Sequence, residues 1–110
     1  MVTVIVHEDS RGRLSSIAAE GHAGWADAGD DVVCAAVSAI LQAAWLGLTA
    51  HAGVPVTGER DRGKLVMRWP DDARERPDVA AIAATAALSI EQIARQYPEH
   101  VQAIRSTERR

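Results

Sequence analysis

The sequence contains one cysteine, no phenylalanine and few aromatic residues of any kind. A single cysteine excludes an internal disulfide and any metal site built from several thiolates. With aromatic residues at 4%, the core must be built from Val, Ile, Leu and Ala side chains. Basic residues are also in the minority. The formal net charge of −3 argues against the basic surface that is typical of a nucleic-acid-binding protein.

Long uninterrupted apolar runs are absent too. The longest, residues 32–50, carries Cys34, Ser38, Gln42 and Thr49, so we expect a helix of a globular domain rather than a membrane span. The N-terminus, MVTVIVHEDS, has no basic segment ahead of an apolar one and does not resemble a signal peptide. These features predict a cytoplasmic protein, and the chain length predicts a single domain, 1–110.

The apolar residues that are present follow two periods. Alternation and β-branched residues predict strands at 2–7, 13–22, 54–59, 64–69 and 100–106. Helical spacing predicts one helix from Val32 to about Gly53, and a second at 77–97 whose buried stripe ends at Tyr97. We expect Trp45 and Trp69 in the core. The order β-β-α-β-β-α-β favours an α+β fold, with a mixed or antiparallel sheet and two long helices packed on it.

The lone cysteine lies at the start of the first predicted helix, after a loop that is rich in glycine. If Asp30 or Asp31 is the N-cap, Cys34 falls in the first turn, where free backbone N–H groups and the helix dipole stabilise a thiolate. Ser38 lies one turn further on. Its hydroxyl can bond either to the sulfur or to a carbonyl of its own helix.

His22, at the head of that loop, can supply a general base for Cys34, and a thiol beside an imidazole is the arrangement of cysteine nucleophilic catalysis. However, an isolated cysteine is commonly a small buried apolar residue, so the spacing alone does not decide. Asp31 either orients His22 as the third member of a triad or only caps the helix. No histidine or cysteine has the spacing of metal ligands, so we expect no metal and no cofactor.

The complete string around the loop is more specific than the spacing. GHA, a short segment that contains glycine, and then GDDVVCAAVSA together resemble the ribosomal-processing cysteine proteases of bacteria, the Prp family. The chain length and the predicted order of elements resemble that family as well. The matching positions are Gly21, His22, Gly29, Asp31, Val32, Val33, Cys34, Ala35 and Ser38.

The resemblance implies a homodimeric cysteine endopeptidase that removes an N-terminal extension from the twenty-seventh large-subunit ribosomal protein. It implies Cys34 as the nucleophile and His22 as the base, with Asp31 and Ser38 in support. A substrate loop that orders over the bound peptide would contain Gly21, Gly24, Trp25 and Gly29. The expected partners are that ribosomal peptide and a second copy, with no membrane and no direct nucleic-acid binding. The alternative is a non-catalytic ribosome-assembly factor that binds the same peptide segment.

Overall fold

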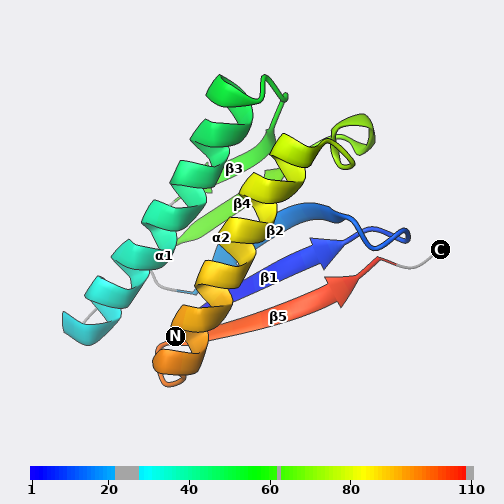
Figure 1. Ribbon diagram of the computed structural model, residues 1–110. Helices are drawn as coiled ribbons and strands as arrows, with labels where there is room; N and C mark the ends of the chain where they lie inside the picture. Colours follow the sequence, from blue (N-terminus) through cyan, green and yellow to red (C-terminus); the bar gives the residue numbers. More distant parts are fainter. Residues whose placement is uncertain (22–27, 62, 109–110) are drawn as a thin grey trace.

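The computed structural model describes residues 1–21, 28–61 and 63–108, with the backbone alone described for 28–31. These residues form five strands and two long helices in the order that the sequence predicts (Figure 1). The elements are β1 (Val2–Glu8), β2 (Leu14–Glu20), α1 (Ala28–Leu46), β3 (Thr57–Asp61), β4 (Lys64–Arg68), α2 (Pro77–Gln96) and β5 (Val101–Thr107). A short π-helix, η1 (Gly47–His51), extends α1, and a 3-10 turn, η2 (Asp71–Ala73), precedes α2. The predicted α+β class is confirmed.

The five strands form one mixed sheet in the order β3-β4-β2-β1-β5. The β1–β2 and β3–β4 pairs are antiparallel hairpins, and β2 pairs with β4 antiparallel. Only β1 and β5 are parallel, with Val2 opposite Val101. The connection between them passes through the rest of the chain, because parallel neighbours need a crossover.

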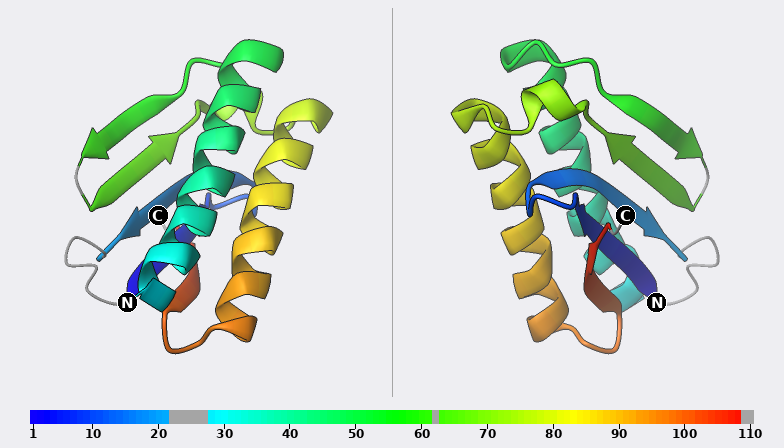
Figure 2. Two further views of the ribbon diagram at one scale, coloured as in Figure 1. Left: turned by 90° about the vertical axis from the view of Figure 1, so that its left-hand side faces the viewer. Right: turned by 90° about the vertical axis from the view of Figure 1, so that its right-hand side faces the viewer.

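Both helices cover the same face of this sheet (Figures 1 and 2). Strand side chains alternate between the two faces, so Val2, Val4 and Val6 of β1 point toward the helices and are buried. The first helix buries the predicted stripe in the same core, including Val37 and Leu41. The core is therefore aliphatic, as the scarcity of aromatic residues requires.

The predicted aromatic core residues have different outcomes. Trp69 is buried, and its Nε1–H donates to the Leu14 carbonyl at 2.8 Å. Trp45 is half-buried and packs against the core. The prediction for Tyr97 is wrong, because this residue is 48% exposed. The helix α2 ends at Gln96 and Tyr97 leaves the helical conformation, because Pro98 cannot continue a helix.

The end of the first helix agrees with the prediction, whereas both ends of the strand that follows it lie further along the chain. The extended α1 ends near Gly53 as predicted, with Gly53 at a φ of 67° and the Val54 N–H bonded to the Leu48 carbonyl at 2.8 Å. Because of this bond, Val54 belongs to the end of the helix and does not begin the strand that was predicted at 54–59. Strand β3 therefore begins at Thr57, after Pro55, and extends to Asp61.

A buried carboxylate joins the β1–β2 turn to the segment before α2. Asp9 is 5% exposed, and its Oδ1 accepts from the backbone N–H groups of Arg11 and Arg13 at 2.9 and 3.0 Å. Its Oδ2 accepts from Arg13 Nε at 3.0 Å and Arg74 Nη1 at 3.2 Å. Burial opposes ionisation, but the hydrogen bonds from Arg13, Arg11 and Arg74 outweigh it and hold the pKa of Asp9 well below its usual value.

Replacing Asp9 removes this link. We expect Asp9→Asn to lower the free energy of unfolding at pH 7, because the ionised carboxylate is bonded only in the folded state. A carboxyl with a lowered pKa stabilises the fold above its unfolded pKa of about 3.9 and loses that effect as pH falls. In denaturant titrations the difference from wild type should therefore shrink below about pH 4.

The matched control is Asp72→Asn, an exposed aspartate beside the same cluster. Its stability should follow wild type at every pH. A deficit in Asp9→Asn that stays constant from pH 7 to pH 3 would contradict the assignment of the effect to the carboxylate charge.

Gly21 fixes the path of the chain where it leaves β2. Its φ of +102° lies in the region that favours glycine, and an added Cβ would lie 2.7 Å from the Met1 carbonyl oxygen. Its N–H donates to the Gly63 carbonyl at 3.3 Å. The end of β2 is thus held between the N-terminus and the β3–β4 hairpin.

We expect Gly21→Ala to reduce the free energy of unfolding by about 1–3 kcal/mol, from backbone strain and the overlap with Met1. Gly12→Ala is the matched control, because Gly12 has a φ of +79° but nothing within 4 Å of its added Cβ. In this variant the free energy of unfolding should fall by about 1 kcal/mol, because only the backbone strain is added. Equal losses in the two variants, measured by denaturation, would show that the contact with Met1 is unimportant.

Candidate active site

Cys34 is the seventh residue of α1, counted from Ala28, and it belongs to the buried stripe of that helix. Cys34 is 5% exposed to solvent. The prediction that it lies in the first turn is wrong, because the helix begins earlier than the sequence pattern indicated. The field of the helix terminus weakens beyond the first turn, so it does less to stabilise a thiolate here than that placement implied.

The earlier start of α1 also changes the position of two other predicted site residues. Gly29 and Asp31 lie within the first turn, so Asp31 is not the N-cap. Acidic residues are favourable throughout the first turn, where they face the positive end of the helix dipole. Asp30 and Asp31 are therefore favourable both within the first helical turn and as an N-cap, so their presence alone could not predict where the helix begins.

Of the remaining residues predicted in the loop, the structure describes only Gly21. Gly21 is described, and its conformation sets the direction in which the chain enters the loop. His22, Gly24 and Trp25 lie outside the described residues. The pairing of His22 with Cys34 therefore stays a prediction.

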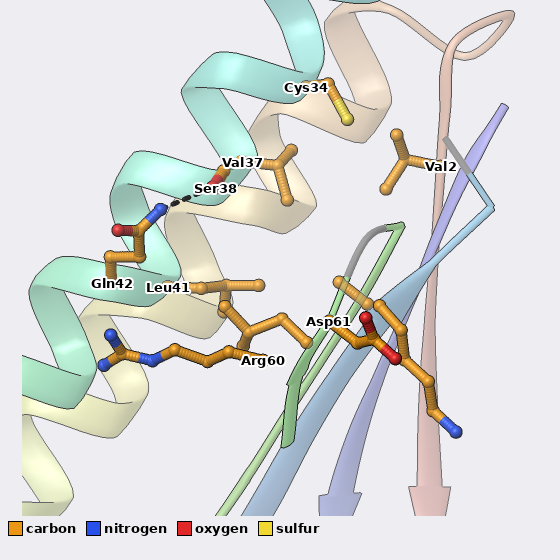
Figure 3. Close-up of a pocket in the computed structure, with 11 residues that line it drawn as sticks. Val2, Cys34, Val37, Ser38, Leu41, Gln42, Arg60 and Asp61 are labelled. Atoms are coloured by element: carbon orange, nitrogen blue, oxygen red, sulfur yellow. Dashed lines mark hydrogen bonds between the residues drawn. The ribbon is translucent and has the colours of Figure 1, made fainter. Parts of the chain in front are cut away.

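A pocket of about 190 Å³ opens between α1 and the strands, and Cys34 forms part of its wall (Figure 3). Its apolar lining comes from β1, β2, β4 and α1, and its polar lining from α1 and the β3–β4 hairpin. The apolar residues are Val2, Ala19, Val37, Leu41 and Leu65, and the polar ones are Ser38, Gln42, Arg60, Asp61 and Lys64. A thiol that is otherwise buried thus borders a space large enough to hold a side chain.

Ser38 and Gln42 follow Cys34 at successive turns of α1, and all three line the pocket. The Gln42 side-chain N–H donates to the Ser38 hydroxyl oxygen at 2.7 Å (Figure 3). That bond occupies one acceptor position of the hydroxyl, and the Ser38 proton remains able to donate elsewhere. Gln42 was not predicted as a site residue, although its i+4 spacing from Ser38 is the signal that would have found it.

Arg60 was also missed, and it marks the far end of the pocket from Cys34 (Figure 3). Its guanidinium lies 4.3 Å from the centre of the Trp45 ring, a cation–π contact that orients it. Arg60 pairs with Leu65 across β3 and β4, which places both on the helix side of the sheet. The predicted strand stopped at residue 59, so this alternation could not be followed to Arg60.

The charges at the pocket are mixed rather than of one sign. Arg60 and Lys64 are cationic and Asp61 is anionic, and Lys64 lies 3.5 Å from the exposed carboxylate of Glu59. Exposed pairs of this kind contribute little to stability. In the part of the chain that the structure describes, no three His, Cys, Asp or Glu residues gather into a set that could hold a metal ion.

Solved structures share this fold. SMU.848 from Streptococcus mutans matches with a TM-score of 0.89 and 27% identity, over 98% of this chain and 96% of that one. The ribosomal processing protease Prp from S. aureus, in complex with a substrate peptide, matches with a TM-score of 0.86 and 22% identity, over 96% and 99%. The same protease with a covalently linked product peptide matches with a TM-score of 0.82 and 23% identity, again over 96% of this chain and 99% of that one.

The sequence itself identifies the family. No curated protein sequence is a match for this chain. The family model described as cysteine protease Prp, however, matches residues 1–102, which is nearly the whole chain. Together with the shared fold and the thiol at the pocket, this match shows that the chain belongs to the Prp family of cysteine proteases.

Proposed function

We propose that the protein is an endopeptidase that removes an N-terminal extension from the twenty-seventh large-subunit ribosomal protein. The observation that carries the proposal is the position of Cys34, a buried thiol at the wall of a pocket that can take a side chain of a peptide. Membership of a cysteine protease family supplies the reaction type. The S. aureus relative was solved with a substrate peptide and with a covalently linked product peptide, which supports a peptide in this site.

In the proposed reaction, His22 takes the proton of the Cys34 thiol, and the sulfur attacks the scissile carbonyl carbon. The C–N bond breaks, the proton on His22 passes to the leaving amine, and the N-terminal fragment stays on Cys34 as a thioester. Water, deprotonated by His22, then attacks the thioester and releases the fragment as a carboxylic acid. The thiol recovers its proton, so the enzyme returns to its starting state.

The supporting residues have narrower proposed roles. Asp31, in the first turn of α1, orients His22 or stabilises the helix start. Ser38, whose oxygen already accepts from Gln42, directs its own proton toward Cys34 or toward a backbone carbonyl. Since burial among apolar groups disfavours a charged sulfur, ionisation of Cys34 depends on His22 more than on the helix terminus.

The proposed setting follows from the substrate. A protease that processes a newly made ribosomal protein acts in the cytoplasm, where ribosomes assemble. The proposal includes a loop that orders over the peptide and contains Gly21, Gly24 and Trp25, with Gly29 in the first turn of the helix that follows, and a second copy of the chain as a partner. It includes no metal and no cofactor.

Replacing Cys34 by Ala should abolish cleavage of a peptide that spans the N-terminal segment of the partner ribosomal protein. The loss should be about 10³-fold or more, because the nucleophile is gone while the small alanine fits the helix. Cleavage is measured by mass spectrometry of the products. Val33→Ala is the matched control, since it shortens the neighbouring buried side chain of α1 and keeps the thiol.

The outcomes separate the two functions. Cleavage by Cys34→Ala at the wild-type rate would exclude a cysteine nucleophile. Peptide binding by the wild type without any cleavage would instead favour the non-catalytic assembly factor. Unchanged circular dichroism confirms that each variant is folded.

His22→Ala should lose cleavage and make Cys34 less reactive toward iodoacetamide near neutral pH. The imidazole favours the thiolate of wild type, whereas the thiol of the variant must ionise unaided and so reacts mainly toward pH 9. Alkylation is followed by intact mass between pH 6 and 9, and the single cysteine makes the product unambiguous. His51→Ala is the control, because His51 lies in η1 and not at the pocket. Equal rates across this range would remove His22 as the activating base.

A further inference from the structure

The pocket at Cys34 follows one flank of α1. Ser38, Gln42 and Trp45 succeed the thiol at intervals of three or four residues, so their side chains leave the helix on the same side. Ser38 and Gln42 line the pocket together with Cys34, and Arg60 lines its far end (Figure 3). The wall opposite α1 is the β3–β4 hairpin. The pocket is therefore elongated, with the thiol at one end and a cation at the other.

The two ends of this pocket are several peptide residues apart. Cys34 and Trp45 are separated by about three turns of α1, or about 16 Å at the helical rise per residue. Arg60 lies against Trp45, so it is at about the same distance from the thiol along the helix axis. An extended peptide advances about 3.3 Å per residue. A peptide held at Cys34 by its scissile bond and extended along α1 would bring about its fourth or fifth residue from that bond to Arg60.

Arg60 is oriented by an aromatic ring, and its hydrogen-bond donors remain available. Its guanidinium carbon lies 4.3 Å from the centre of the Trp45 ring. Stacking on a ring uses the face of a guanidinium and leaves the N–H groups at its edge able to donate. Arg13, Arg74 and Arg105 each pair with a carboxylate. Within residues 1–21, 28–61 and 63–108, by contrast, no carboxylate pairs with Arg60.

The cation can be reached from solvent although it lies on the helix side of the sheet. Arg60 pairs with Leu65 and shares its face of the sheet. It is nevertheless exposed, because β3 is an edge strand and the hairpin extends to the side of α1 (Figure 2). A peptide that enters the pocket from solvent therefore meets the guanidinium without displacing another side chain of the core.

A carboxylate is the partner that fits this guanidinium best. Two N–H groups of an arginine bind the two oxygens of Asp or Glu in parallel, and such charged hydrogen bonds are stronger than neutral ones. A carboxamide offers one oxygen and no charge, and a basic side chain is repelled. Because the Trp45 ring already holds Arg60, less side-chain freedom is lost when the carboxylate binds.

The charge of Arg60 also indicates which part of the substrate lies beside it. Ribosomal proteins bind RNA phosphates through Lys and Arg side chains, so their mature chains are basic. Arg60 would repel a basic segment. The segment before the scissile bond, which is the part removed, therefore extends from Cys34 toward Arg60, and the mature segment leaves in the other direction.

We propose that Arg60 is a specificity-determining residue, which binds an acidic side chain about four or five residues before the scissile bond, and that Trp45 positions its guanidinium. This inference rests on the proposed endopeptidase function and adds to it a sequence preference in the removed segment. Arg60 is remote from the reacting atoms, so the carboxylate stabilises the ground state and the transition state equally. It should lower KM and leave kcat unchanged.

The test uses a peptide that spans the N-terminal segment of the ribosomal protein. Each residue is replaced in turn by Glu, Gln or Lys, and the scissile bond is located by mass spectrometry of the wild-type products. Binding is measured by fluorescence anisotropy of the labelled peptides with the Cys34→Ala variant, so it does not require cleavage. At the fourth or fifth residue before the bond, Glu should bind about tenfold more tightly than Gln, and Lys more weakly than Gln.

Charge reversal assigns this preference to one residue. In Arg60→Glu, made in the Cys34→Ala background, the order should invert, with the Lys peptide bound more tightly than the Glu peptide. Arg68→Glu is the matched control, because it makes the same change in charge on the same hairpin. Arg68 is exposed, lies on the opposite face of the sheet from Arg60 and does not line the pocket. This control should keep the wild-type order.

The role of Trp45 is tested by two replacements. Trp45→Phe keeps a ring beneath the guanidinium and should keep most of the preference for Glu over Gln. Trp45→Leu should reduce that preference to a few fold, because Arg60 keeps its charge and loses its orientation. Circular dichroism confirms that each variant is folded. An unchanged preference in Trp45→Leu would remove Trp45 as a positioning residue.

Four results would overturn the inference about Arg60. They are equal binding of the Glu and Gln peptides at every position, a Glu preference only after the scissile bond, a wild-type order in Arg60→Glu, and an inverted order in Arg68→Glu as well. If wild type still cleaves the peptide, any of these results leaves the protease function intact. Binding that depends on Arg60 without any cleavage would instead contradict the reaction and support the contact.

Discussion

The packing of α1 against the sheet is the constraint on which the rest of the molecule depends. The inward stripe of this helix and the buried residues of the strands form one core, and Cys34 belongs to that stripe together with Val37 and Leu41. The same contact that builds the core therefore holds the thiol beside the pocket. Because the only aromatic side chains in the core of the described residues are Trp69 and, at its margin, Trp45, the position of the helix is set mainly by aliphatic packing along its length.

Local patterns predicted most of the fold. The alternation of β1 and the bounds of α2, set by Pro77 and Pro98, could be predicted because each depends on neighbours in sequence. Contacts between distant segments could not. The bond between Arg74 and Asp9 joins residues 65 positions apart, and no local pattern indicates it.

The residues of the site also differ in whether a local pattern could predict them. Cys34 and Ser38 on one helix followed from spacing, and Gln42 could have been found by the same rule. The placement of Cys34 in the first turn was wrong because small and acidic residues before it suit either a loop or a helix start. Arg60 reaches the pocket only through the register of β3 with β4, which the sequence leaves open.

The role of Cys34 as nucleophile is tested most directly by trapping the covalent intermediate. The protein is mixed with the ribosomal peptide, quenched with acid within the first turnover, and weighed intact. We expect a mass increase equal to the N-terminal fragment minus one water, mapped to the single cysteine and lost on addition of hydroxylamine. Product formation at every quench time without any adduct on Cys34 would contradict a thioester mechanism.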